Sequence, residues 1–245
     1  MIVWGRGVAF MKWLLVVILV LAFGEESHAE SIQVSPILIE INAPATSSTI
    51  TLKTDAKKPR VAQLRIMRWS QVDGKELLEA TDDVVASPPF ATLASNTSYT
   101  VRIVRQSSAP VLREESYRLL IDQLPDDQSS KKNTVGFAIR YSLPVFVRPA
   151  NGGKAVLEWD AELVDGAVKL TAINSGNRGA KLTDLKISDG SSFVRFGTNG
   201  AAGYILPGQS MSWKKPAPKG FAGGAVKISA RNETETINAQ VEVVP

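Results

Sequence analysis

The chain carries almost none of the side chains on which most catalytic sites depend. Its 245 residues include no cysteine and one histidine, His28. These counts exclude a cysteine nucleophile, disulfides and zinc sites of the Cys/His type. If His28 is removed with a leader, a Ser-His-Asp arrangement is excluded as well. The composition therefore points away from most enzymes, and we expect no cofactor and no bound metal.

Two catalytic arrangements need neither cysteine nor histidine: a pair of carboxylates and a Ser-Lys dyad. No Asp/Glu pair stands out in a motif, and Ser129-Ser130-Lys131 sits within a polar stretch from Asp126 to Asn133. A secreted hydrolase is therefore the least supported alternative. The formal charge of +4 is spread over separate lysine pairs that do not gather with aromatic residues, so we expect no nucleic-acid partner.

The first 29 residues have the pattern of a secretory signal peptide. Arg6 and Lys12 precede an apolar run from Trp13 to Phe23, and small residues at Ser27 and Ala29 fit a cleavage site after Ala29. The run is shorter than the roughly 20 residues that a membrane-spanning helix needs. A retained membrane anchor is the alternative. No later segment approaches that length, so we expect an exported chain without stable membrane insertion.

The rest of the sequence alternates with a period of two residues, as half-buried strands do. Apolar side chains recur at Ile50/Leu52, Leu64/Ile66, Tyr99/Val101/Ile103, Tyr117/Leu119/Ile121 and Ile237/Ala239/Val241/Val243. Turn sequences separate these runs at short intervals, which is typical of β-sandwiches of about 100 residues each. We therefore predict an all-β protein with two sandwiches. The Pro/Gly-rich stretch from Arg148 to Gly153 places their boundary between residues 30–149 and 150–245.

The first strand after the leader changes parity. Its apolar residues are Ile32 and Val34, then Ile37, Ile39 and Ile41, with Ser35-Pro36 between the two sets. A slip of one residue turns every side chain to the other face of a sheet. The strand is therefore expected to bulge or to change sheets at Ser35-Pro36, and its proline indicates an edge position.

A second strand is unusually long. Apolar residues occupy every alternate position from Val135 to Val147: Val135, Phe137, Ile139, Tyr141, Leu143, Val145 and Val147. A strand of that length would extend about 43 Å, more than one sandwich face covers. Because Pro144 donates no amide hydrogen bond, an edge position is indicated. The segment from Val135 to Tyr141 then forms an exposed apolar edge suited to pairing with another chain. The alternative is a long central strand covered by the second domain.

Several stretches resemble the periplasmic chaperones of the pilus chaperone–usher pathway. Ala86-Ser87-Pro88-Pro89, followed by Leu93 and Tyr99–Ile103, is similar to that family's A-T-P-P…L…V-R-I pattern. Glu115–Leu119 through Leu124-Pro125 is similar to its E-S-x-Y-R-L…P pattern, and Phe146-Val147-Arg148-Pro149 to its F-Y-R-P pattern. The three stretches also agree with the family in order and spacing. The second domain matches loosely, chiefly through Leu206-Pro207-Gly208-Gln209-Ser210.

The resemblance implies two immunoglobulin-like domains set at an angle and a location in the periplasm. It also implies that the partners are pilin or fibre subunits, each lacking one strand, and an outer-membrane usher. The chaperone fills the subunit's groove with its own edge strand, with Val135, Phe137, Ile139 and Tyr141 as the groove-filling side chains. For the chaperone without a subunit, we expect a dimer that covers this edge.

One part of the family pattern is missing. In the best-known branch, a basic pair holds the subunit's C-terminal carboxylate, and the corresponding positions here are Leu38 and Pro144. This departure suggests a divergent branch. Our hypothesis is that Arg118 replaces the pair, together with Arg140, since a planar guanidinium binds a carboxylate with two parallel hydrogen bonds.

Each arginine also has a structural interpretation. Arg118 could form an ion pair with Asp122 or Glu115, and Arg140 could be a solvated charge that discourages edge aggregation. The remaining alternative for the whole protein is a pilus subunit or adhesin of the same sandwich class. The broken N-terminal strand and the complete closing strand from Ile237 to Val243 argue against a subunit.

Overall fold

The computed structural model describes residues 31–72, 74–124, 139–221, 223–233 and 235–244. These residues form eighteen β-strands and no helix, which confirms the all-β prediction, and none of them belongs to a helix that could cross a membrane. The expected signal peptide (1–29), the loop from Asp126 to Asn133, and Val135 and Phe137 lie outside the described residues.

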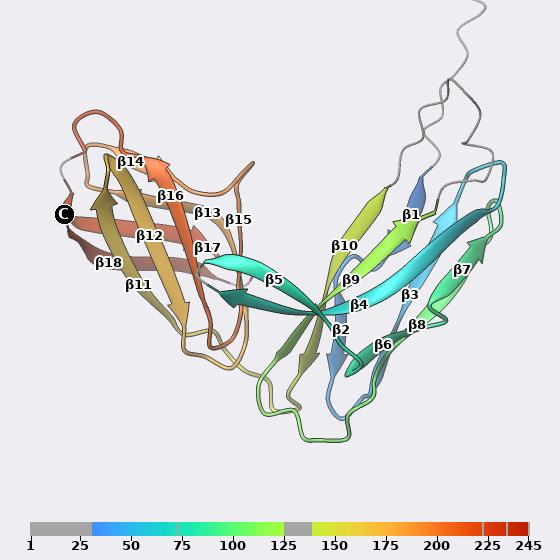
Figure 1. Cartoon of the computed structure of the whole chain (residues 1–245). Helices are drawn as coiled ribbons and strands as arrows, with labels where there is room; N and C mark the ends of the chain where they lie inside the picture. The colour runs from blue at the N-terminus through green and yellow to red at the C-terminus, as the bar shows by residue number, and fades with distance from the viewer. Residues whose placement is uncertain (1–30, 73, 125–138, 222, 234, 245) are drawn as a thin grey trace, which may run out of the picture. The chain divides into compact units, whose positions relative to one another are not determined.

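The first sandwich consists of two sheets (Figure 1). One sheet has the order β1 (Ile32–Ser35), β3 (Ser47–Thr54), β8 (Tyr99–Arg105), β6 (Val84–Ser87). The other has the order β2 (Ile39–Asn42), β10 (Arg140–Arg148), β9 (Glu115–Gln123), β4 (Arg60–Val72), β5 (Lys75–Ala80), with β7 (Phe90–Leu93) also paired to β4. Side chains from both sheets fill one core.

The expected change of sheet at Ser35-Pro36 is confirmed. β1 pairs antiparallel with β3 in one sheet, whereas β2 pairs parallel with β10 in the other. Both β1 and β2 are edge strands, as the proline indicated. Ile32 from β1 and Ile39 from β2 reach the same core from the two layers. The N-terminal segment therefore ties the two sheets of the sandwich together.

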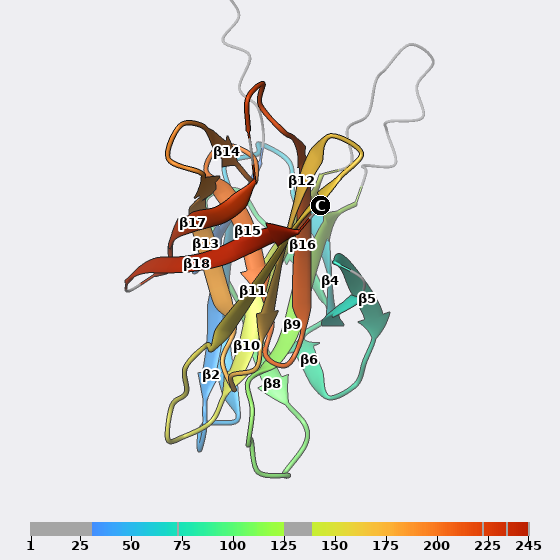
Figure 2. The same ribbon diagram turned by 90° about the vertical axis from the view of Figure 1, so that its left-hand side faces the viewer.

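The second sandwich is built from one eight-stranded sheet, β14 (Phe193–Arg195), β13 (Ala180–Ser188), β17 (Gly224–Arg231), β18 (Thr236–Val244), β11 (Leu157–Val164), β12 (Ala167–Asn174), β16 (Ser210–Pro216), with β15 (Ala201–Ile205) beside β13. Only two residue pairs join β11 to β18, so the sheet divides there into two halves. Figure 2 shows β17 and β18 running across the direction of β11, β12 and β16, and both halves contribute to one core. The closing strand expected from Ile237 to Val243 is β18.

Strand β9 shows how the alternating pattern positions the rest of the first sandwich. Tyr117, Leu119 and Ile121 are fully buried in the core. The intervening residues therefore project from the opposite face of the sheet. Arg118 and Asp122, both candidates for polar contacts, lie on that outer face because of their parity alone.

Replacing Leu119 by alanine tests this core. Leu119 is fully buried, so we expect Leu119→Ala to lower the free energy of unfolding by about 2–5 kcal/mol. The measurement is denaturation in urea. Leu77→Ala is the matched control because Leu77 is 43% exposed, and its effect should stay within about 0.5 kcal/mol. Equal losses for the two variants would contradict the assignment of the core.

Candidate functional site

The outer face of the β2-β10-β9-β4-β5 sheet carries a guanidinium surrounded by apolar side chains. The register places Arg118 of β9 directly between Met67 of β4 and Pro144 of β10. Trp69 follows Met67 on the same face, with Leu78 of β5 opposite it. Directly paired residues of antiparallel strands share a face and contact each other. The sheet therefore fixes one positive charge within an apolar surround.

Arg118 is held in place mainly by stacking. Its Cζ atom lies 3.7 Å from the centre of the Trp69 ring and 6.0 Å from the centre of the Tyr204 ring. Its Nη2 donates one hydrogen bond, of 3.1 Å, to Oε1 of Glu76 on β5. The structural interpretation from the sequence named the wrong acid, since the ion-pair partner is Glu76 and neither Asp122 nor Glu115. Those two carboxylates bind other arginines.

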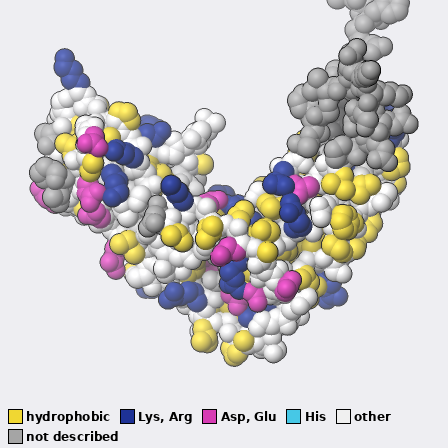
Figure 3. All heavy atoms as spheres, in the orientation of Figure 1, with side chains coloured by type: hydrophobic (Ala, Val, Ile, Leu, Met, Phe, Trp, Pro, Cys, Tyr) yellow, Lys and Arg dark blue, Asp and Glu magenta, His cyan; other side chains and the backbone are white. Residues whose placement is uncertain are grey.

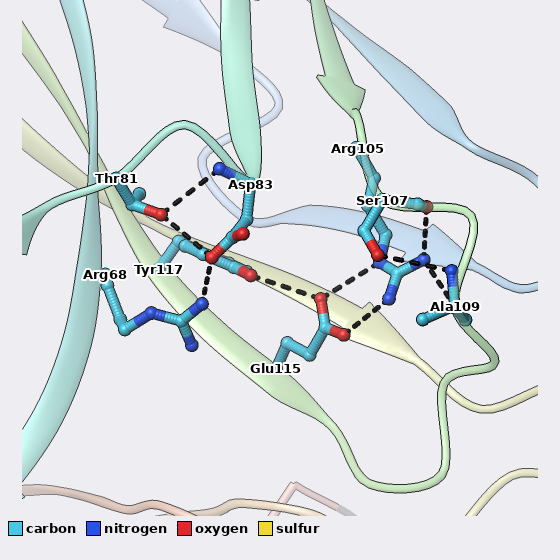
Figure 4. Close-up of polar contacts among 8 residues, drawn as sticks. All are labelled: Arg68, Thr81, Asp83, Arg105, Ser107, Ala109, Glu115 and Tyr117. Carbon is cyan, nitrogen blue, oxygen red and sulfur yellow. Dashed lines mark hydrogen bonds and ion pairs between the residues drawn. The ribbon is translucent and has the colours of Figure 1, made fainter.

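Two other arginines with similarly buried side chains are bound far more completely. Arg105 donates two hydrogen bonds to Glu115, of 3.0 and 2.7 Å, and one each to the carbonyls of Ser107 and Ala109 (Figure 4). Tyr117 donates its hydroxyl to the same Glu115 carboxylate, and burial together with that charge raises the pKa of Tyr117. This network closes the loop between β8 and β9.

Arg148, at the end of β10, has two acidic partners. It contacts Glu114 at 2.9 Å and Glu40 at 2.5 Å, while the other oxygen of Glu114 accepts a hydrogen bond from the backbone amide of Gly179. The side chains of Arg105, Arg148 and Arg118 are 7%, 15% and 14% exposed. Within the described part of the chain, Arg118 thus has one hydrogen bond where comparably buried arginines have two to four. The guanidinium of Arg118 therefore has N–H donors available for a further hydrogen-bond acceptor.

The two positions at which the family's basic pair was expected have different roles here. Leu38 packs in an apolar cluster with Trp69, Phe146, Leu206 and Tyr204. The rings of Trp69 and Tyr204 meet edge to face with their centres 5.3 Å apart. Pro144, the second position, is the β10 neighbour of Arg118. The two positions that carry basic residues in the best-known branch are therefore apolar here, and Arg118 lies among apolar side chains.

Two buried polar atoms next to this guanidinium have no hydrogen-bond partner among the described residues. They are Nε1 of Trp69 and Oγ of Ser116, in side chains that are more than nine-tenths buried. Ser116 lies two residues before Arg118 on the same face of β9, and Phe146 is its partner on β10. An unpaired buried polar group has a free-energy cost.

Strand β10 is paired unevenly along its length. It pairs with β9 from Arg140 to Val147, but β2 pairs only with the part from Val145 to Arg148. Residues Arg140 to Pro144 therefore have a strand neighbour on one side only within the described structure. Beside this free edge Ile139 is 36% exposed, and Tyr141 packs partly buried against the core.

Arg140 has a separate setting from Arg118. Its Nε donates to Oδ1 of Asp122 at 2.5 Å, and Arg65 donates to the other oxygen of Asp122 at 2.7 Å. Arg140 lies on the outer face, opposite the face of Tyr141, but it is paired across from Asp122 while Arg118 is paired across from Pro144. The structure thus places the two candidate arginines on one face and in separate ion pairs.

Sequence reasoning missed Trp69 and Glu76. The signal that could have found them is the turn sequence Val72-Asp73-Gly74-Lys75, which predicts a hairpin. In the structure β4 pairs with β5, and Glu76 lies opposite Gln71. Among the described residues no group of three or more histidine, cysteine, aspartate or glutamate side chains could hold a metal ion. On the face shown in Figure 3, acidic and basic side chains are interspersed.

The comparisons with known proteins agree with this architecture. Residues 31–152 match the family model described as pili and flagellar-assembly chaperone, PapD N-terminal domain. No match was found among curated protein sequences. Residues 31–152 therefore belong to the PapD N-terminal domain family, and the chain is a pilus-assembly chaperone.

Several solved structures share the fold over most of the chain. The crystal structure of the CsuC–CsuE chaperone–tip adhesion subunit pre-assembly complex, from the archaic chaperone–usher Csu pili of Acinetobacter baumannii, matches at 25% identity and a TM-score of 0.65, covering 87% of this chain and 98% of that one. The Salmonella enterica SafA pilin in complex with the SafB chaperone matches at 16% identity and 0.62, covering 88% and 98%. The E. coli chaperone DraB matches at 19% and 0.58, covering 87% and 97%.

The ion pairs of Asp122 predict a pH effect. Hydrogen bonds from Arg140 and Arg65 hold the pKa of Asp122 below its usual range against an opposing effect of burial. The stability that this carboxylate contributes is therefore present above an unfolded pKa of about 3.9 and is lost as the pH falls through the lower folded value.

In Arg140→Ala, we expect the pKa of Asp122 to rise toward its ordinary value. The measurement is a carbon-13 NMR titration of the side-chain carboxyl. Arg102→Ala is the control, since Arg102 bonds Ser47 in the other sheet. An unchanged Asp122 titration in Arg140→Ala would contradict the assigned pair.

Proposed function

We propose that this chain is a periplasmic chaperone that binds pilin subunits by donating an edge strand and delivers them to an outer-membrane usher. The observation that supports the proposal best is the free edge of β10 from Arg140 to Pro144. A strand with unpaired backbone groups on one side is a template for pairing with another chain. A subunit that lacks a strand gains in this way both the missing backbone hydrogen bonds and apolar side chains for its groove.

The groove-filling side chains in this proposal are Val135, Phe137, Ile139 and Tyr141. Each large apolar side chain that becomes fully buried contributes about 1.5–3 kcal/mol, less the entropy lost when the strand is ordered. The exposed fraction of Ile139 and the partial burial of Tyr141 support Tyr141 as the inner limit of the donor segment. Because neighbouring residues of a strand point to opposite faces, Tyr141 of β10 lies on the face opposite Arg140.

The client's C-terminal carboxylate is anchored, in this proposal, by Arg118. Its guanidinium is mostly buried, is held flat on Trp69 and has hydrogen-bond donors to spare. Burying a charge without full pairing costs free energy, so binding a further carboxylate to Arg118 would be favourable. Arg140 is the weaker candidate, because Asp122 already binds it and its side chain is 58% exposed.

The remaining parts of the proposal combine the sequence pattern with the family resemblance. The protein works in the periplasm after removal of residues 1–29, acts without catalysis, and divides into domains 30–149 and 150–245. Without a subunit, two copies cover each other's β10 edges. The complete closing strand β18 favours a chaperone over a pilus subunit, which would lack a strand.

Substitution of Ile139 tests strand donation. The Ile139→Asp variant places a charge where an apolar groove would bury it, so we expect co-purification of the subunit to fall at least tenfold. The assay is co-expression with the products of neighbouring open reading frames, followed by mass analysis of the purified complex. Ile37→Asp is the matched control because Ile37 is 71% exposed outside the strands. Full subunit yield with Ile139→Asp would overturn strand donation at this position.

The same assay tests the anchor separately. We expect Arg118→Ala to abolish co-purification and Arg118→Lys to restore it only in part, because an ammonium lacks the planar fork. Arg102→Ala, on the other sheet, should leave the yield unchanged. Circular dichroism of each variant checks that the chaperone is folded. A normal subunit yield from folded Arg118→Ala would remove Arg118 from the mechanism.

A further inference from the structure

The ion pair between Glu76 and Arg118 differs from the other buried-arginine pairs in the first sandwich. The contact is a single hydrogen bond of 3.1 Å, longer than the 2.7–2.9 Å usual for charged pairs. The Glu76 side chain is 43% exposed, compared with 26% for Glu115 and 2% for Glu114. An exposed acid with one long hydrogen bond is the easiest of these carboxylates to displace.

The strand that carries Glu76 leaves this carboxylate free to rotate away. All six residues of β5 are exposed, and β5 pairs with β4 alone. Beyond Arg68 the register between β4 and β9 ends, so the paired residues 69–72 of β4 and 75–78 of β5 extend past β9, with Glu76 near the end of this part. Turning the side chain of Glu76 into solvent breaks no other hydrogen bond that the described residues make with it.

A carboxylate is also the chemical group that Arg118 is proposed to bind in a client. Glu76 and the C terminus of a subunit present the same ligand to the same guanidinium. Trp69 keeps the guanidinium flat by stacking from one side, whichever carboxylate is bound. Although Arg118 has hydrogen-bond donors to spare, two carboxylates on one guanidinium repel each other, so Glu76 and the subunit's carboxylate would compete for the cation.

We propose that Glu76 is an internal ligand of the anchor, which occupies Arg118 in the unloaded chaperone and is displaced by the C-terminal carboxylate of a subunit. This inference rests on the proposed role of Arg118 and adds that Glu76 regulates how tightly Arg118 binds a carboxylate. Glu76 keeps the cation paired when no client is bound, lowers its affinity for stray anions, and returns to it when a client leaves. The chaperone thereby binds its client more weakly than an unopposed Arg118 would.

The test measures the affinity of the full chain for a defined carboxylate. The probe is N-acetyl-Gly-Phe, compared with its C-terminal amide, which lacks the carboxylate. The readout is the indole N–H signal of Trp69 in a nitrogen-15 NMR titration, assigned through Trp69→Phe. That N–H has no partner among the described residues, so its signal is a sensitive reporter.

We expect Glu76→Gln to bind the free acid about fivefold more tightly than the wild type, the gain available from removing an exposed ion pair. Glu79→Gln is the matched control, because it removes the same charge from the same strand on the opposite face. Urea denaturation of Glu76→Gln should show equal or lower stability, so the affinity rises while stability does not. If the role of Glu76 were only structural, Glu76→Gln would lower both the affinity for the acid and the stability.

The possible results separate the inference from the proposed function. If Arg118→Gln abolishes the preference for acid over amide and Glu76→Gln leaves the affinity unchanged, the anchor stands and the internal ligand is wrong. An equal gain in Glu79→Gln also overturns the internal ligand, because long-range charge would then explain it. If Arg118→Gln keeps the preference, or if no variant distinguishes acid from amide, the anchor itself fails and the inference fails with it.

Discussion

The strict alternation of strand β9 is the constraint on which the rest of the first sandwich depends. Because Tyr117, Leu119 and Ile121 point into the core, Arg118 lies on the outer face of the sheet. The same rule places Trp69 beside it on β4 and Glu76 beside it on β5. The packing of the core thus determines which side chains lie on the outer face of the sheet.

Much of this architecture could be predicted from the sequence because period-two patterns and turn signals are local. The two-sandwich fold, the closing strand and the change of sheet at Ser35-Pro36 were all within reach of that reasoning. The partner of Arg118 was not, because it depends on which strand flanks β4 on its far side. Glu76 comes 42 residues earlier in the chain, and only the assembled sheet brings the two side chains together.

The missing basic pair illustrates the same limit. Leu38 and Pro144 could be identified from the sequence as unable to bind a carboxylate, but their actual surroundings could not. Leu38 packs with Trp69 and Phe146, and this cluster also contacts Leu206 and Tyr204, far along the chain. Stacking on the rings of Trp69 and Tyr204 holds Arg118 in place, and such packing leaves no motif in a linear sequence.

The parallel pairing of β2 with the end of β10 has a geometric consequence for a partner strand. β2 begins at Ile39, opposite Val145, and occupies the edge from there to Arg148. A strand added along β10 must therefore stop when it reaches Pro144. In the proposed complex, β2 would therefore limit how far a subunit's strand can extend along β10.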